Sequence, residues 1–299
     1  MIDYRLHLTS LVAVFLALGL GMLIGGALTS TPPPAAQQQA LNTLQQRFAE
    51  FSRQYADLRD ENDDLGERMR REDEGIRALT APLAAHRLEG RRIALILCGD
   101  VDGAAFLGDL IRALEESGAT VASTTRIQDD WLPVDEEGRN AVLSALGAFN
   151  PRLSDARAAA VVGRAVANGR AVALRDAARA SGGLRLDGDY SRRVYGVLLI
   201  SGAQTPERLQ AAKAGITPEA GLLRGLREAE VRVVATEPDG PESLTTIPFW
   251  SGLAPATVDN IDMAAGQLCA VYALAGRDAR FGIKRAAERA FPEVEIRRP

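Results

Sequence analysis

The sequence predicts an α/β protein in three parts: an N-terminal transmembrane helix, a parallel dimeric coiled-coil stalk, and a Rossmann-like α/β domain with a mainly parallel sheet. Residues 8–46 contain no Asp, Glu, Lys or Arg, and an apolar heptad pattern covers residues 41–80. After residue 88, apolar runs typical of buried strands alternate with helical patterns. The 299 residues, 46% of them hydrophobic and 25% charged, suit a globular domain with an added elongated segment.

The N-terminal segment Leu8–Leu28 is mostly aliphatic. As a helix it would be about 31 Å long, which matches the hydrocarbon thickness of a bilayer. A cleaved signal peptide is the alternative, but its apolar region is usually only about 7–15 residues long. We therefore predict an uncleaved transmembrane anchor over residues 8–30. Arg5 is the nearest positive charge, so the positive-inside rule puts residues 1–7 in the cytoplasm and the bulk of the chain outside a bacterial cell membrane.

Small residues recur at every fourth position of this anchor, which allows two helix backbones to approach closely. Background composition is the alternative explanation, because glycine and alanine are common in membrane helices. The regular spacing favours self-association of the anchor. The residues predicted to line the helix pair are Ala13, Ala17, Gly21 and Gly25.

Three prolines at positions 32–34 end the anchor and predict a stiff linker over residues 31–40. The coiled coil follows over residues 41–80, where ten of the twelve a and d positions are apolar. Asn62 occupies an a position, where a single Asn fixes register and favours a parallel pair. An amphipathic helix lying on the C-terminal domain is the alternative. The predicted core residues are Leu41, Leu44, Phe48, Phe51, Tyr55, Leu58, Asn62, Leu65, Met69, Ile76 and Leu79.

The remaining chain, residues 88–299, reads as one extracytoplasmic α/β domain. Four runs predict strands, at residues 91–98, 119–124, 194–200 and 231–235. Helical patterns lie between and after them, at residues 103–117, 139–182, 217–230 and 262–275. Such alternation predicts a parallel sheet whose ligands bind beyond the carboxyl ends of the strands.

Polar residues collect at those strand ends. We predict that Asp102 and Asp262 cap the helices that follow them, and that Asp100, Asp259 and Asn260 form a recognition site. The run LILCGDVDG is similar to the strand and D-x-D-G motif of haloacid dehalogenase-like phosphatases, but Ala104 stands where a hydroxyl residue is expected. The chain also contains no P-loop and no G-x-S-x-G motif. We predict no enzyme activity, no catalytic residues and no cofactor, with a metal-dependent hydrolase as the least favoured reading.

The net charge and the numbers of cysteines and histidines exclude several kinds of binding partner and metal site. A net charge of -4 argues against nucleic-acid binding, which normally needs a basic face. Two cysteines and two histidines cannot build a disulfide scaffold or a four-ligand zinc module with the usual spacing. Cys98 and Cys269 are each predicted to be small buried apolar residues, so no metal site is predicted.

The opening MIDYRLHLTSLVAVFLALGLGMLIG and the later TVDNIDMAAGQLCAVYALAG closely resemble the MctB-like bacterial copper transporter family, which includes the cell-separation protein SteB. The resemblance implies a single-pass membrane protein that acts in copper export or copper resistance. Its SteB branch implies a role in cell separation, with a peptidoglycan hydrolase outside and a cytoplasmic or membrane division partner.

The residues themselves can be weighed against these two functions. Copper(I) prefers clustered Cys and Met ligands, whereas the four methionines and two cysteines here are dispersed. The sequence therefore favours a membrane-anchored homodimeric scaffold of the cell envelope, with copper transport kept as the alternative.

Overall fold

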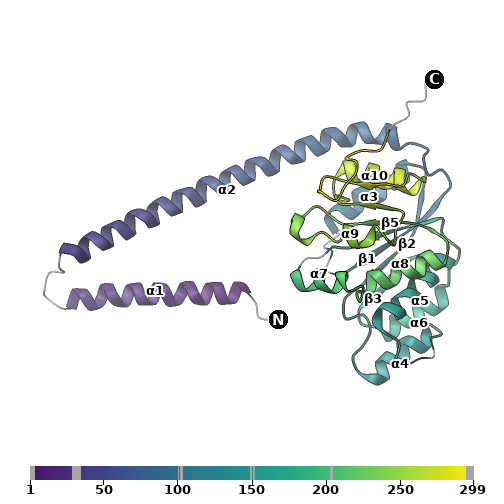
Figure 1. The fold of residues 1–299 in the computed structure, drawn as a ribbon, viewed down its shortest axis with the longest axis horizontal. Helices are drawn as coiled ribbons and strands as arrows, with labels where there is room; N and C mark the ends of the chain where they lie inside the picture. Colours follow the sequence, from purple (N-terminus) through teal and green to yellow (C-terminus); the bar gives the residue numbers. More distant parts are fainter. Residues whose placement is uncertain are drawn as a thin grey trace. The chain divides into compact units, whose positions relative to one another are not determined.

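The computed structural model describes residues 4–28, 35–99, 101, 104–148, 150, 152–202 and 205–293 (Figure 1). The chain divides into two compact units, Met1–Met69 and Arg70–Pro299, each of which is described by itself. The predicted capping residue Asp102 and the predicted recognition residue Asp100 lie outside the described residues, as do the prolines of the linker.

The first unit contains helix α1 (Tyr4–Leu28) and the first part of helix α2 (Ala35–Ala84). The large apolar side chains of α1 that the structure describes, from Leu11 to Ile24, are each more than half exposed. Within the described residues, no helix combines the length and the hydropathy that a membrane span requires.

Helix α2 is one continuous element of 50 residues, and it includes the second half of the segment that we predicted to be a linker. Gly66 and Gly75 do not interrupt it, and Pro82 falls in its last turn. The predicted apolar core residues from Leu41 to Met69 are between 46% and 73% exposed. These side chains form an exposed apolar stripe at heptad spacing along α2, and monomeric soluble proteins rarely expose a contiguous apolar patch of this kind. The coiled coil and the dimer themselves stay predictions.

The second unit is built on one sheet, which has seven strands among the described residues, in the order β3-β2-β1-β4-β5-β6-β7. All neighbouring strands run parallel except β3, which pairs antiparallel with β2. The mainly parallel α/β fold predicted from the sequence is confirmed. The strands are β1 (Arg92–Cys98), β2 (Thr120–Ile127), β3 (Leu184–Gly188), β4 (Gly196–Ile200), β5 (Arg232–Thr236), β6 (Ala256–Val258) and β7 (Arg280–Phe281).

Helices cover both faces of this sheet, so the strands are buried between two apolar layers (Figure 1). One face packs against α3 (Ala104–Glu116) and α10 (Ala264–Leu274). The helices that contribute to the other face are α4 (Glu136–Ala145), α5 (Asp155–Asn168), α6 (Ala171–Ala180), α7 (Pro206–Lys213), α8 (Pro218–Glu228) and the short α9 (Ile247–Trp250).

Helices α5 and α8 approach each other closely through small residues. A β-carbon on Gly221 would lie 1.8 Å from the Ala156 carbonyl oxygen, and one on Gly225 would lie 1.9 Å from the Ala160 carbonyl oxygen. Contact at this distance is open only to glycine, since any side chain would collide with backbone. The two glycines, one turn apart, therefore allow α8 to lie directly against the backbone of α5.

The last turns of α2 belong to the same compact unit as the sheet, Arg70–Pro299. Asp73 accepts a hydrogen bond of 2.7 Å from the backbone N–H of Ala264, in the first turn of α10. Arg77 donates to Gln267 of α10 at 3.2 Å and pairs with Asp109 of α3 at 3.2 Å. This part of the helix matches the alternative reading, in which α2 lies on the domain.

The same contacts correct the prediction for Asp262. The N-cap residue of α10 is Met263, whose side chain makes no capping bond, and Asp73 satisfies a first-turn N–H instead. Asp262 accepts a 2.7 Å hydrogen bond from the N–H of Asp239. Its carboxylate thus joins two loops and does not cap the helix.

Candidate functional site

The sheet reverses its strand order between β1 and β4, because β2 and β3 lie on one side of β1 and β4 to β7 on the other. Connections leave the two central strands in opposite directions at such a point, which opens a crevice beyond their carboxyl ends. Gly99 follows β1 there with φ of +71°, and Ser201 follows β4. A β-carbon on Gly99 would lie 2.7 Å from the guanidinium carbon of Arg208.

Four polar residues contact one another at this edge of the sheet, and we call them the switch-point cluster: Asp129, Ser201, Arg208 and Glu219. Arg208, from α7, forms ion pairs with Asp129 and with Glu219, from the first turn of α8. The Ser201 hydroxyl donates to Glu219 Oε1 at 2.7 Å. The Glu219 side chain is 1% exposed and that of Arg208 is 13% exposed, so both charges are largely removed from water.

Burial and charge act together on the groups of this cluster. Burial alone would lower the pKa of Arg208, but the Glu219 and Asp129 carboxylates outweigh it and raise that pKa above its usual value. Burial, reinforced by Glu219, raises the pKa of the Cys98 thiol well above its ordinary range. The thiol therefore stays protonated, and the cluster provides a fixed ion pair and no activated nucleophile.

One atom of the cluster has spare binding capacity. Glu219 Oε2 is buried and accepts no hydrogen bond from the part of the chain that the structure describes. Leaving a carboxylate oxygen without a donor costs free energy, so the site favours a hydrogen-bond donor from outside the protein or from water. The chemistry available here is binding of a donor group.

The sequence analysis did not find Arg208 or Glu219. The tripeptide T-P-E starts both α7 and α8, with Thr205 and Thr217 as the N-cap residues. Glu207 of the first copy is exposed, whereas Glu219 of the second is buried. The repeated motif signals two helix starts, but only the tertiary structure shows which glutamate enters the crevice.

A second buried network closes the sheet at β5, β6 and β7. Lys284 Nζ lies 2.7 Å from Glu237 Oε1, and both side chains are nearly inaccessible. Glu237 Oε2 also accepts from the N–H and the hydroxyl of Thr246, at 2.8 and 2.7 Å. Here every charge has a partner, so this network has a structural role.

The predicted recognition residues Asp259 and Asn260 follow β6 beside this network, and both are buried. Asp259 accepts hydrogen bonds from the N–H groups of Ile283 and Lys284, at 2.8 and 3.0 Å. Burial raises the pKa of Asp259, while those two N–H groups act in the opposite direction. Asp259 thus holds the chain after β7 in place, and a role of either residue in recognition stays a prediction.

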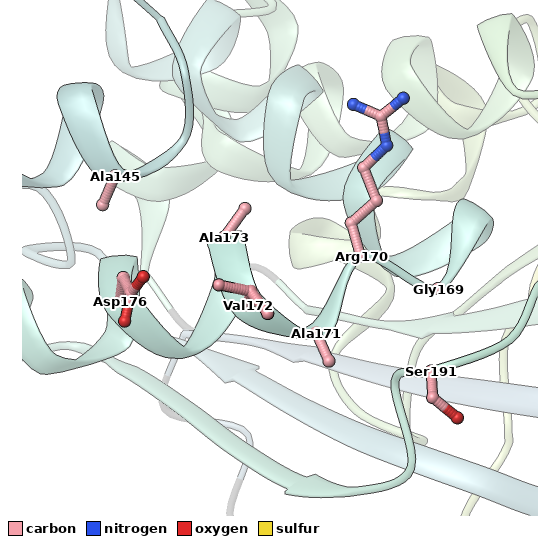
Figure 2. A pocket seen from close by; sticks show the side chains of 8 residues that line it. All are labelled: Ala145, Gly169, Arg170, Ala171, Val172, Ala173, Asp176 and Ser191. Atoms are coloured by element: carbon pink, nitrogen blue, oxygen red, sulfur yellow. The ribbon is translucent and has the colours of Figure 1, made fainter.

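A shallow hollow of about 600 Å³ lies beside the start of α6 (Figure 2). Five of its eight lining residues are Ala, Gly or Val, and the polar ones are Arg170, Asp176 and Ser191. Asp176 is already paired with Arg179, and the Arg170 side chain points away from both Asp176 and Ser191 in Figure 2. No set of polar groups converges there among the residues drawn, so the hollow is not a candidate site.

Comparison with known proteins identifies the family of the chain. A family described as "Copper transport outer membrane protein, MctB" matches residues 1–292. The chain belongs to the MctB family. A search of curated proteins gave no match.

The copper named in the MctB family description can be tested against the donor atoms of this chain. Cys98 packs in the core on the face of the sheet covered by α5 and α8, whereas Cys269 packs on the opposite face. Burial raises the pKa of Cys269 to about 12, so both thiols resist the ionisation that a metal thiolate needs. Nor do three His, Cys, Asp or Glu side chains converge as metal ligands anywhere in the described ranges. The Cys, His, Asp and Glu side chains of the described residues therefore form no copper(I) site.

Proposed function

We propose that this member of the MctB family is a membrane-anchored, dimeric scaffold of the cell envelope, whose α/β domain is an interaction module without enzyme activity. The observation that carries the proposal is the apolar heptad stripe of α2, exposed from Leu41 to Met69. An isolated chain gains nothing from exposing so many large apolar side chains in a row, so a partner surface is needed.

A second copy of α2 is the partner that the stripe fits. Its apolar positions alternate at spacings of three and four residues, the pattern that interlocks with an identical helix as knobs into holes. Asn62 interrupts the stripe at an a position, where two copies in parallel and in register place their amides together. This supports a parallel homodimer over any unrelated apolar partner.

The family description names an outer membrane protein, which supports membrane association of this chain. The exposed apolar side chains of α1, from Leu11 to Ile24, would be costly in water and are favourable in lipid. We propose that α1 is a single-pass anchor with the N-terminus in the cytoplasm and that Gly21 and Gly25 line its self-contact. The SteB branch of the resemblance suggests a peptidoglycan hydrolase as the partner outside.

Crosslinking of full-length protein in native membranes tests the dimer. In a parallel, in-register pair, Asn62→Cys brings two thiols together, so mild oxidation is expected to give a covalent dimer. Asp60→Cys, at an f position two residues away, is the matched control and is expected to stay monomeric because f positions face outward. Equal crosslinking of both variants, or of neither, would contradict the parallel dimer.

Copper transport is the second candidate, because the family description names it. If Cys98 and Cys269 are only core residues, Cys→Ser at either is expected to lower the thermal midpoint without changing Cu(I) binding by the detergent-solubilised chain. Competition with a coloured Cu(I) chelator measures the binding. One equivalent of tightly bound Cu(I) that is lost on either substitution would establish the copper function instead.

A further inference from the structure

A second cavity opens at the carboxyl edge of the sheet, beside Gly99 at the end of β1. It has a volume of about 510 Å³, in the range of small-molecule sites, and is lined by Leu97, Gly99, Val101, Arg126, Ile127, Gln128, Gly183 and Arg185. Apolar side chains form one part of the lining, and two guanidinium groups form another.

The two arginines face each other across the β2–β3 ladder. Arg126 and Arg185 are directly paired in register, and Arg126 is in turn level with Leu97 of β1. Side chains paired in register point to the same face of a sheet, and Leu97 packs on the face covered by α3 and α10. The row Leu97, Arg126, Arg185 therefore forms one wall of the cavity.

Among the described residues, neither guanidinium has an acidic partner. Throughout the described ranges, no hydrogen bond or ion pair joins either of them to another residue. The acidic residue next on that face of β3 is Asp187, which is level with Thr124 and makes no ion pair with Arg185 in the described chain. By contrast, Arg92 at the start of β1 pairs with Asp189 at 2.8 Å.

Like charges directly opposite each other on neighbouring strands destabilise a sheet. An anion that binds between two such charges offsets their repulsion. Arg126 and Arg185 line a cavity that can admit one. Two planar guanidinium groups can each bind a phosphate through paired N–H bonds. Their combined charge of two matches the roughly −1.5 to −2 carried by a phosphate monoester near neutral pH.

We propose that this cavity binds a phosphate monoester, with the phosphate held between Arg126 and Arg185 and the organic group against Leu97 and Val101. The proposal is independent of α1 and α2, since every residue of the cavity belongs to the α/β unit. A soluble phosphate ester and the headgroup of phosphatidic acid share this chemistry, and the experiment separates them.

The test uses the full chain in a non-ionic detergent. Phenyl phosphate is titrated by calorimetry, and binding to vesicles with and without phosphatidic acid is measured by flotation. Arg126→Gln and Arg185→Gln are each expected to weaken binding at least about tenfold, because each removes charge-assisted hydrogen bonds to the phosphate. Arg175→Gln, an exposed arginine of α6 outside the cavity, is the matched control and is expected to bind as the parent does.

A second readout separates a binding site from a chance pair of arginines. Without ligand, Arg126→Gln is expected to raise the thermal midpoint, since it removes the repulsion, and to lose the further rise that phenyl phosphate gives the parent. Binding of phenyl phosphate to the parent would identify a soluble phosphate ester as the ligand. Binding to phosphatidic acid vesicles alone would identify a lipid headgroup as the ligand. Failure of the parent to bind either one, or equal binding by the parent and both Gln variants, would overturn the proposal.

Discussion

Lys284→Met is expected to lower the free energy of unfolding of the α/β domain by about 3–5 kcal/mol, because it leaves the Glu237 carboxylate buried without its counter-charge. Chemical denaturation of the detergent-solubilised protein, followed by circular dichroism, measures the change. The side chain of Glu237 is 2% exposed, so water cannot replace the lost ammonium group.

Lys213→Met supplies the control, since these two are the only lysines of the sequence. Lys213 is exposed at the end of α7, so its replacement is expected to change stability by less than about 0.5 kcal/mol. Adding Glu237→Gln to Lys284→Met removes the unpaired charge and keeps an acceptor for Thr246, and is expected to recover much of the loss. A Lys284→Met protein as stable as the parent would show that the pair does not hold the β5 to β7 edge together.

Gly225→Ala is expected to lower the free energy of unfolding by about 3 kcal/mol, although alanine is the better helix former, because its β-carbon would overlap the Ala160 carbonyl oxygen. Gly108→Ala in α3 is the matched control. A β-carbon there meets nothing within 4 Å, so the same substitution is expected to add about 0.5–1 kcal/mol. Opposite signs for the two variants are the expected result, and equal signs would contradict the close approach of α5 and α8.

Strong local patterns predicted the architecture. The apolar runs at residues 91–98 and 194–200 became the central strands β1 and β4, because strands buried on both faces need no polar alternation. The heptads predicted a long helix, and α2 is one. Strands β6 and β7 were not predicted, because β6 has three residues and β7 has two, and no periodic pattern can be recognised over so few residues.

Contacts between distant residues are what the sequence could not supply. Asp262 precedes α10 as a capping residue should, yet the carboxylate that bonds to the first turn is Asp73, 191 residues away from Ala264. Arg208 and Glu219 belong to ordinary helix starts, and their pairing depends on how α7 and α8 fold back over β4. The facing arginines of β2 and β3 depend on the register of β3, a short edge strand that the sequence analysis missed.

The positions of the two cysteines have a consequence for redox chemistry. Each thiol is buried, and the sheet lies between them, so no bond can join Cys98 to Cys269 while the domain is folded. Oxidation can link them only after the strands separate. In an oxidising compartment, a Cys98–Cys269 disulfide would therefore be found only in molecules that had unfolded. It would prevent those molecules from refolding until the bond was reduced.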